Sequence, residues 1–142
     1  MAADSTIPGL SSATPLTGTE LFVLSQGGVT VNITAALLAA RGILQTLTFN
    51  AAQAWDVSQG NMGILTLTGN ATLSAPTNLQ PGSYLLIVTQ DATGNRTMSF
   101  ASAYKWAGGF APVLSTAANA IDILSFVSDG TYMYGSAQKA FA

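Results

Sequence analysis

The segment Ser83-Tyr84-Leu85-Leu86-Ile87-Val88-Thr89-Gln90 decides the fold class of this chain. Its centre consists of aliphatic and β-branched residues, which favour a strand, and its length suits a strand better than a helix. The near-continuous apolar run predicts a strand that is buried on both faces. The turn-forming residues Asp91-Ala92-Thr93-Gly94-Asn95 follow directly. Arg96–Phe100 is therefore predicted to be the returning strand of a hairpin.

Short apolar segments separated by turn residues continue on both sides of this predicted hairpin. Ala120–Val127 and Thr131–Tyr134 are expected to pair around Ser128-Asp129-Gly130, because Asp-Gly is a strong turn signal. Further strands are predicted at Gln45–Phe49, Ile64–Thr68 and Ala71–Ser74. About eight short strands at this spacing are typical of a sandwich or jelly roll. We therefore predict a mainly β chain in which residues 45–142 form an antiparallel β-sandwich or jelly-roll-like domain, without an internal sequence repeat.

The first 44 residues have a different composition and are predicted to form a separate N-terminal region. Ala2–Pro15 is rich in Ser, Thr, Pro and Gly and predicts an extended arm. Two strands, Glu20–Leu24 and Val29–Ile33, are expected around Gly27 and Gly28, and Thr34 can cap a short helix at Ala35–Ala40. This strand-strand-helix module is too small to bury a core of its own.

The composition limits the classes of function. Of the 142 residues 49% are apolar and only 7% are charged, whereas in soluble domains about 25% of the residues are usually charged. A surface so poor in charge predicts a homo-oligomer. The net charge of −2 provides no basic field for nucleic acid, and the longest aliphatic run, Leu85–Val88, is far too short to span a membrane. We therefore expect neither a nucleic-acid nor a membrane partner.

The titratable residues argue against catalysis. The chain has no His and no Cys, which excludes thiol nucleophiles and the Ser-His-Asp triad. Asp56, Asp122 and Asp129 are scattered singly, whereas metal sites and glycosidase pairs need clustered carboxylates. Asp91 and Arg96 flank a turn and can pair across it, with Lys105 the nearest further charge in the sequence. We predict a protein that is not an enzyme and has no catalytic residue, metal or cofactor.

The aromatic residues allow two interpretations. Packing in a core or an interface is the commoner role of such side chains. Aromatic faces also stack on sugar rings, and a host-glycan patch would be sought first at Trp106, Tyr132 and Tyr134. Tyr132 and Tyr134 are two residues apart and would share one face of a strand.

Two segments resemble structural proteins of tailed bacteriophages. Ala13–Leu21 and Gln26–Val31, with the predicted short helix, resemble an N-terminal module that begins tail fibres and head appendages. A second resemblance, to a β-sandwich module of phage virion proteins, covers about Thr46–Gly135. It rests on Leu65–Leu73, Pro76–Leu79, Pro81-Gly82, Val88–Arg96 and Tyr104–Trp106.

The resemblance implies a non-enzymatic virion protein, made in the host cytoplasm and carried on the particle surface. The expected form is a homotrimer that docks on the major capsid protein or another virion protein through its N-terminal region. Its attachment residues would be Leu16, Glu20, Phe22, Val29 and Val31. Because no receptor-binding tip follows the sandwich, we expect a capsid decoration or short head fibre. The alternative is a tail-fibre or baseplate adhesin that binds host surface polysaccharide.

Overall fold

The computed structural model describes residues 21–26, 29–34 and 43–141 of a chain that divides into two units, Met1–Ala39 and Ala40–Ala142. In the first unit β1 (Leu21–Gln26) and β2 (Val29–Thr34) form an antiparallel hairpin in which Gln26 pairs with Val29. The hairpin predicted from this part of the sequence is thus confirmed. The predicted arm and the predicted helix lie outside the described residues.

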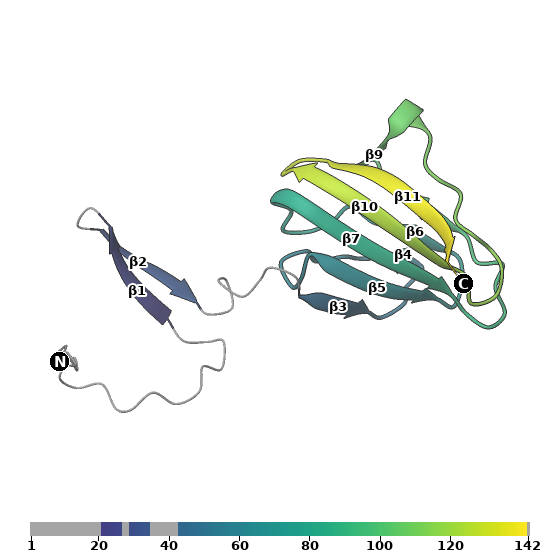
Figure 1. Ribbon diagram of the computed structural model, residues 1–142, viewed down its shortest axis with the longest axis horizontal. Helices are drawn as coiled ribbons and strands as arrows, with labels where there is room; N and C mark the ends of the chain where they lie inside the picture. Colours follow the sequence, from purple (N-terminus) through teal and green to yellow (C-terminus); the bar gives the residue numbers. More distant parts are fainter. Residues whose placement is uncertain (1–20, 27–28, 35–42, 142) are drawn as a thin grey trace. The chain divides into compact units, whose positions relative to one another are not determined.

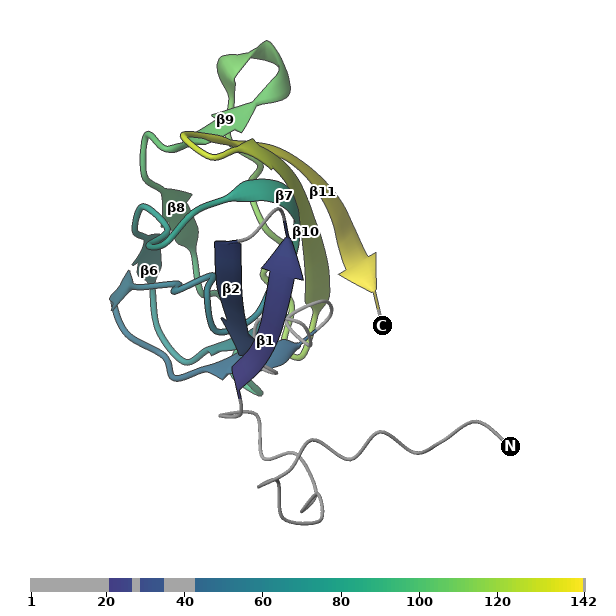
Figure 2. The same ribbon diagram turned by 90° about the vertical axis from the view of Figure 1, so that its left-hand side faces the viewer.

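The second unit consists of two β-sheets (Figure 1). The six-stranded sheet has the order β3-β5-β7-β10-β11-β9, with strands Leu44–Leu47, Met62–Leu67, Pro81–Gln90, Ile121–Asp129, Met133–Phe141 and Tyr104–Trp106. The three-stranded sheet has the order β4-β6-β8, with strands Ala52–Gln53, Ala71–Leu73 and Met98–Phe100. Figure 2 shows β6 and β8 on one side of the unit and β7, β10 and β11 on the other. The predicted mainly β, sandwich-like fold is confirmed, and no helix in the described part of the chain could span a membrane.

The first strands of the sandwich alternate between the two sheets. β3, β5 and β7 are parallel neighbours in the six-stranded sheet, and β4, β6 and β8 are parallel neighbours in the other. The chain therefore winds through the sandwich in successive coils. The antiparallel arrangement predicted for these strands is wrong, because they pair in parallel. The paired residues are not evenly spaced, since Leu44 pairs with Met62 but Ala71 pairs with Met98. This uneven spacing explains why no sequence repeat is visible.

The predicted hairpin of residues 83–100 is wrong, because β8 pairs with β6 and lies in the opposite sheet from β7. The turn between β7 and β8 is built to cross between the sheets. Asp91 accepts hydrogen bonds from the backbone N–H groups of Thr93 and Gly94, and Gly94 adopts a φ of 69°. The buried side chain of Gln90 accepts from the backbone of Arg96 and donates to its carbonyl. These bonds satisfy the backbone of the turn without a hairpin ladder.

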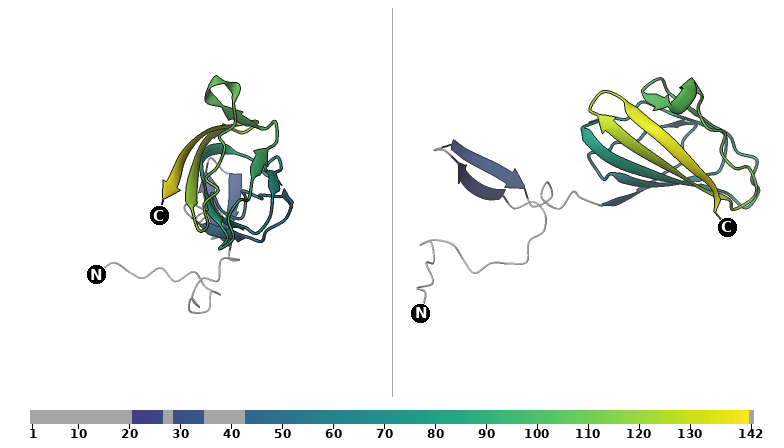
Figure 3. Two further views of the ribbon diagram at one scale, coloured as in Figure 1. Left: turned by 90° about the vertical axis from the view of Figure 1, so that its right-hand side faces the viewer. Right: turned by 45° about the horizontal axis from the view of Figure 1, so that its top comes forward.

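The C-terminal strands are antiparallel, as predicted. β10 lies between β7 and β11, and Ser128 pairs with Met133 around the Asp129-Gly130 turn. β11 extends to Phe141, well beyond the predicted end at Tyr134. β9 adds to the outer edge of β11 in a parallel orientation, and the short 3-10 helix η1 (Ala107–Gly109) follows it. Figure 3 shows β9 and η1 beyond the long strands.

The two sheets enclose an apolar core that is organised around aromatic rings. Trp55 is completely buried and lies 6.2 Å, centroid to centroid, from both Tyr84 and Phe126. Phe126 also contacts Tyr104 and Trp106, so the rings link strands of the six-stranded sheet with the segment after β4. Leu79 packs against the core from the loop before β7.

The two faces of the six-stranded sheet differ in burial. The inner face, which packs toward the three-stranded sheet, buries Tyr84, Leu86 and Val88 of β7. The outer face carries Leu85 and Ile87 of the same strand, which are only half-buried. The predicted burial on both faces is therefore wrong. The physical reason is that no element of residues 43–141 lies over the outer face (Figures 2 and 3).

Candidate functional site

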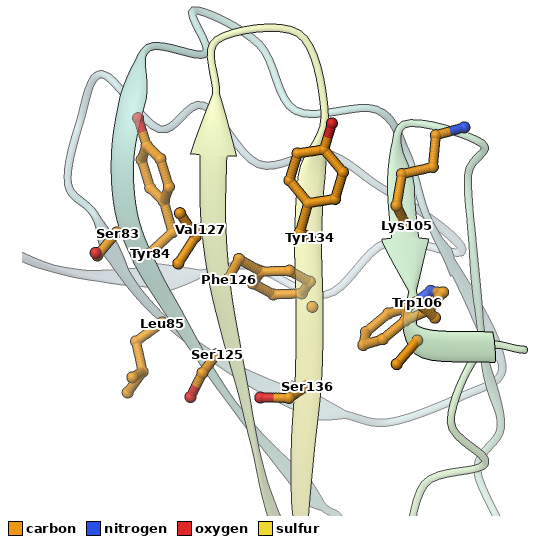
Figure 4. A pocket seen from close by; sticks show the side chains of 12 residues that line it. Ser83, Tyr84, Leu85, Lys105, Trp106, Ser125, Phe126, Val127, Tyr134 and Ser136 are labelled. Atoms are coloured by element: carbon orange, nitrogen blue, oxygen red, sulfur yellow. The ribbon is translucent and has the colours of Figure 1, made fainter. Parts of the chain in front are cut away.

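An open groove lies at one end of the outer face, where β7, β10, β11 and β9 run side by side (Figure 4). Its volume is about 530 Å³, within the range typical of small-molecule sites. The lining residues are Ser83, Tyr84, Leu85, Lys105, Trp106, Ala107, Ser125, Phe126, Val127, Tyr134, Gly135 and Ser136.

The strand register places the outward side chains of the groove in two rows. Directly paired residues of neighbouring strands project to the same face of a sheet. One row crosses four strands and consists of Ser83, Val127, Tyr134 and Lys105. The next row consists of Leu85, Ser125 and Ser136. The groove therefore combines hydroxyl groups with exposed apolar surface, because Val127 is 62% exposed and Tyr134 is 50% exposed.

Trp106 belongs to the wall of the groove and is anchored from the inner side of the sheet. It pairs with Gly135 across the edge of the sheet and contacts the rings of Phe100 and Phe126. A Cβ atom at Gly135 would lie 2.6 Å from Cζ3 of Trp106 and 2.8 Å from Cε1 of Phe126. The absence of a side chain at Gly135 is therefore what allows both rings to pack beneath β11.

Tyr134 is held by the carboxylate of Asp129, which lies at the end of β10. The phenol donates a hydrogen bond of 2.9 Å to Oδ2 of Asp129, while Oδ1 accepts from the N–H groups of Tyr132 and Thr131. The hydrogen bonds from these backbone N–H groups lower the pKa of Asp129, and the bond from Tyr132 contributes most. The same carboxylate raises the pKa of Tyr134, because it accepts a bond from the neutral phenol. Tyr134 therefore keeps its proton at neutral pH and presents a fixed ring.

Tyr132 does not line the groove, although the sequence grouped it with Tyr134 and Trp106. It lies just before β11, and the Nζ atom of Lys105 sits 4.4 Å from the centroid of its ring. This cation–π contact covers one face of Tyr132. The structure thus brings Trp106 and Tyr134 to one groove and leaves Tyr132 beside it.

The other charged residues singled out in the sequence lie apart from the groove or serve the backbone. Arg96 binds Asp91 through Nη2 at 2.8 Å and through Nε at 3.1 Å, as the sequence suggests, while Lys105 lies at the groove. Asp56 accepts bonds from Ser58 and Asn78, and the buried Asp122 accepts from the N–H groups of Ser115 and Ala140. Within the described residues no three acidic side chains gather where they could hold a metal ion.

The proposed attachment residues are placed only in part. Phe22 lies on β1, and Val29 and Val31 lie on β2, where Val31 pairs with Leu24. Leu16 and Glu20 lie outside the described residues. Their role in attachment therefore stays a prediction.

Several residues of the groove were not identified from the sequence. Ser83, Ser125 and Ser136 carry no individual signal, and Lys105 was grouped with Asp91 and Arg96 instead. The one usable signal was Val127, an apolar residue next to the Ser128-Asp129-Gly130 turn and directly opposite Tyr134 once the hairpin register is assumed. The groove can offer a ligand several hydroxyl groups and a fixed aromatic ring, which suits a polyhydroxylated molecule.

Part of the chain matches a known protein family. Residues 50–133 match the model of the family described as "Putative phage tail fibre C-terminal domain". The matched segment covers more than half of the chain and includes most of the groove-forming strands. No curated protein and no solved structure matches the chain.

Proposed function

The chain belongs to the phage tail fibre C-terminal domain family, and from this premise we propose that it binds a saccharide of the host surface in its groove. Membership of the family makes it a component of the phage particle. The finer statement, that it is an adhesin of the tail-fibre type, is our proposal. It places the activity in adhesion and assigns no catalytic step to the protein.

The observation that carries the proposal is the row Ser83, Val127, Tyr134 and Lys105 across four adjacent strands. A sugar ring has an apolar C–H face and a polar rim of hydroxyl groups. The ring of Tyr134 and the side chain of Val127 offer exposed apolar surface for the C–H face of the sugar. The hydroxyl groups of Ser83, Ser125 and Ser136 offer donors and acceptors for the polar rim.

The test compares two tyrosines that lie close together. Tyr134→Ala removes the ring that lines the groove, whereas Tyr132→Ala removes a similarly exposed ring outside it. Binding of the purified protein to host surface polysaccharide is measured by calorimetry. Tyr134→Ala is expected to weaken binding at least about tenfold, which corresponds to about 1.4 kcal/mol. Tyr132→Ala is expected to change the affinity less than about twofold.

Three results count against the proposal. They are equal affinities of Tyr134→Ala and the unaltered protein, the absence of any binding to host cells or their polysaccharide, and shortening of the polysaccharide during the assay. Circular dichroism of both variants serves as the folding control.

A second placement in the particle is favoured by the N-terminal sequence. Ala13–Leu21 and Gln26–Val31 resemble attachment modules that also occur in head appendages. We therefore keep as a second proposal that the protein decorates the capsid or forms a short head fibre, docked on the major capsid protein through its N-terminal region. The number of copies per particle separates the two placements. Hundreds of copies indicate capsid decoration, and about a dozen indicate a tail appendage.

A further inference from the structure

A second groove lies along the free edge of the three-stranded sheet. β8 is the last strand of this sheet, and the loop of residues 110–116 lies beside its unpaired edge. The volume between the strand and the loop is about 420 Å³. Residues 97–100 form one wall and residues 111–114 and 116 form the other, and none of them is charged. We call this site the edge groove.

The backbone of β8 offers hydrogen-bonding groups to the edge groove. The carbonyl of Thr97 accepts a bond from β6, and the N–H of Ala101 donates one to β6. Because backbone groups alternate in direction along a strand, Met98 and Phe100 turn theirs away from β6 and toward the groove. No backbone hydrogen bond from a turn or loop of residues 43–141 reaches either residue. N–H and C=O groups left open along an edge are a template for a further strand.

The loop that forms the other wall is fixed in place. The carbonyl of Thr116 accepts a bond of 2.7 Å from the N–H of Asn95, just before β8. Leu114 is buried in the core, and Lys139 donates a bond of 3.1 Å to the carbonyl of Val113. These contacts hold the loop near β8 without bonding it to the strand. The edge groove is therefore a formed site with two walls.

The loop itself is a poor candidate for the missing strand. Pro112 lies in its centre and has no N–H group to donate to a ladder. A separate segment that enters the groove can supply the donors and acceptors that the loop lacks.

We infer that the edge groove binds an extended, uncharged segment of another protein, which adds to the three-stranded sheet as a further strand. The alternating N–H and C=O groups of Met98 and Phe100 are complementary to the backbone of an extended peptide. A charged side chain that entered the groove would lose water without gaining a partner there, since no lining residue is charged. This inference goes beyond the proposed function, because it concerns the other sheet and a peptide ligand.

The experiment uses the full chain and a peptide of alternating threonine and valine, acetylated and amidated, whose length of about five residues spans the groove. Hydrogen exchange of single amides is followed by NMR spectroscopy. In the free protein the amides of Met98 and Phe100 are expected to exchange faster than that of Ser99, which faces β6. Saturating peptide should slow exchange at Met98 and Phe100 at least about tenfold and leave Ser99 within about twofold. Protection of Met98 and Phe100 in the free protein would overturn the inference, because the chain itself would then occupy the edge.

Two N-methylated peptides distinguish an added strand from a ligand held only by apolar contact. One is methylated on the valine nitrogens and the other on the threonine nitrogens, so each lacks the N–H groups along one edge. Only one edge of the peptide can face β8. One methylated peptide should therefore bind at least about tenfold more weakly than the unmodified peptide, and the other within about threefold. Equal affinities of all three peptides would contradict strand addition.

A pair of variants locates the binding in the groove. Ala111→Trp places a large side chain in the groove and should weaken peptide binding at least about tenfold. Ala118→Trp is the matched control, because Ala118 is an exposed alanine that lies between the loop and β10 and does not line the groove. It should bind like the unaltered protein.

Two further results would overturn the inference. They are a dissociation constant above about 1 mM for the unmodified peptide and equal binding by Ala111→Trp and the unaltered protein. If Ala111→Trp does not fold, the methylated peptides still decide the question on the unaltered protein. Polysaccharide binding by Tyr134→Ala tests the proposed function separately.

Discussion

The inner and outer faces of the six-stranded sheet are both apolar, yet only one of them is covered within residues 43–141. Leu86 and Leu124 of the inner face are completely buried against the three-stranded sheet. Leu85 and Ile123, their neighbours in the sequence, are half-buried on the outer face. The comparison teaches that hydrophobicity alone does not identify the core side of this sheet. What identifies it is the second sheet, which the coiled path of the chain brings to one face only.

Two adjacent leucines of β7 test this difference most directly. Leu86→Ala removes a fully buried side chain and is expected to lower the free energy of unfolding by about 2–5 kcal/mol. Leu85→Ala makes the same chemical change on the outer face, where the side chain is already partly in water. Its cost should be below about 1 kcal/mol.

The measurement is urea unfolding at a concentration low enough for the protein to be monomeric. Equal losses in the two variants would mean that the outer face is covered after all. A larger loss in Leu85→Ala at high than at low protein concentration would show that copies of the chain cover this face.

The sequence predicted the strands well and their partners poorly. Local sequence patterns indicate the strands, for example the alternation in Gln45–Phe49 and the Asp-Gly turn after β10. The pairing of β8 with β6 depends on the path of the chain after Asp91, and nothing in the sequence of Arg96–Phe100 indicates which sheet this segment joins. Likewise the alternation of Ile121-Asp122-Ile123 is visible in the sequence, but it does not show which side faces inward. The inward side of Asp122 is the one where the backbone N–H groups of Ser115 and Ala140, from outside β10, bind its carboxylate.

The candidate groove shows the same limit. Trp106 and Tyr134 were identifiable as aromatic residues, and the structure brings both to the groove. Their serine neighbours come from three different strands and become a set only through the register. Residue type therefore indicated the kind of site, while tertiary pairing determined its members.

Asp122 allows the inner face to be tested where it is polar. Its two carboxylate oxygens accept the N–H groups of Ser115 and Ala140, at 2.6 and 2.8 Å. Asp122→Asn keeps the size of the side chain but presents an NH₂ group to one of these donors. The expected loss is about 2–3 kcal/mol of unfolding free energy, because a charged hydrogen bond is lost and a buried N–H is left unpaired.

The same urea titration measures this loss. Ser128→Ala is a useful comparison. Ser128 is also buried on β10, but its side chain is uncharged and accepts one hydrogen bond, from the backbone N–H of Gly130. A loss in Asp122→Asn no greater than that in Ser128→Ala would contradict the assigned role of the carboxylate.

A substitution of Gly135 tests how tightly the rings on the inner face pack against β11 at the groove. An alanine there would place its Cβ atom against the rings of Trp106 and Phe126 on the inner side. We expect Gly135→Ala to destabilise the protein by about 1–3 kcal/mol, the usual cost of overpacking a dense core. Tryptophan fluorescence should change together with stability, because Trp106 must move.

The control for Gly135→Ala is Ser136→Ala, which alters an exposed residue of the same strand without adding volume. Unchanged stability and fluorescence in Gly135→Ala would show that the rings are not packed beneath β11 as described.

The smallest expected effect is a dependence of stability on acid, and it should arise outside both faces. Asp56, Asp91 and Asp129 lie in turns or at strand ends, and hydrogen bonds lower the pKa of each. For Asp91 the largest cause is the bond from Arg96. A carboxyl group whose pKa is lower in the folded than in the unfolded chain stabilises the folded state above its unfolded pKa, which is about 3.9. That contribution is lost as the pH falls through the folded pKa.

Stability should therefore be nearly constant from pH 7 to about pH 5 and decline below about pH 4, where the unfolded chain begins to bind protons first. Urea unfolding at a series of pH values measures the decline. In Asp91→Asn the decline should be shallower than in the unaltered protein, because one of the three groups no longer titrates. Parallel pH profiles for the two proteins would show that the Asp91–Arg96 pair does not contribute. The outward aliphatic side chains of β5, β7 and β10 carry no titratable group, so acid should weaken the fold through the turns and not through this face of the sheet.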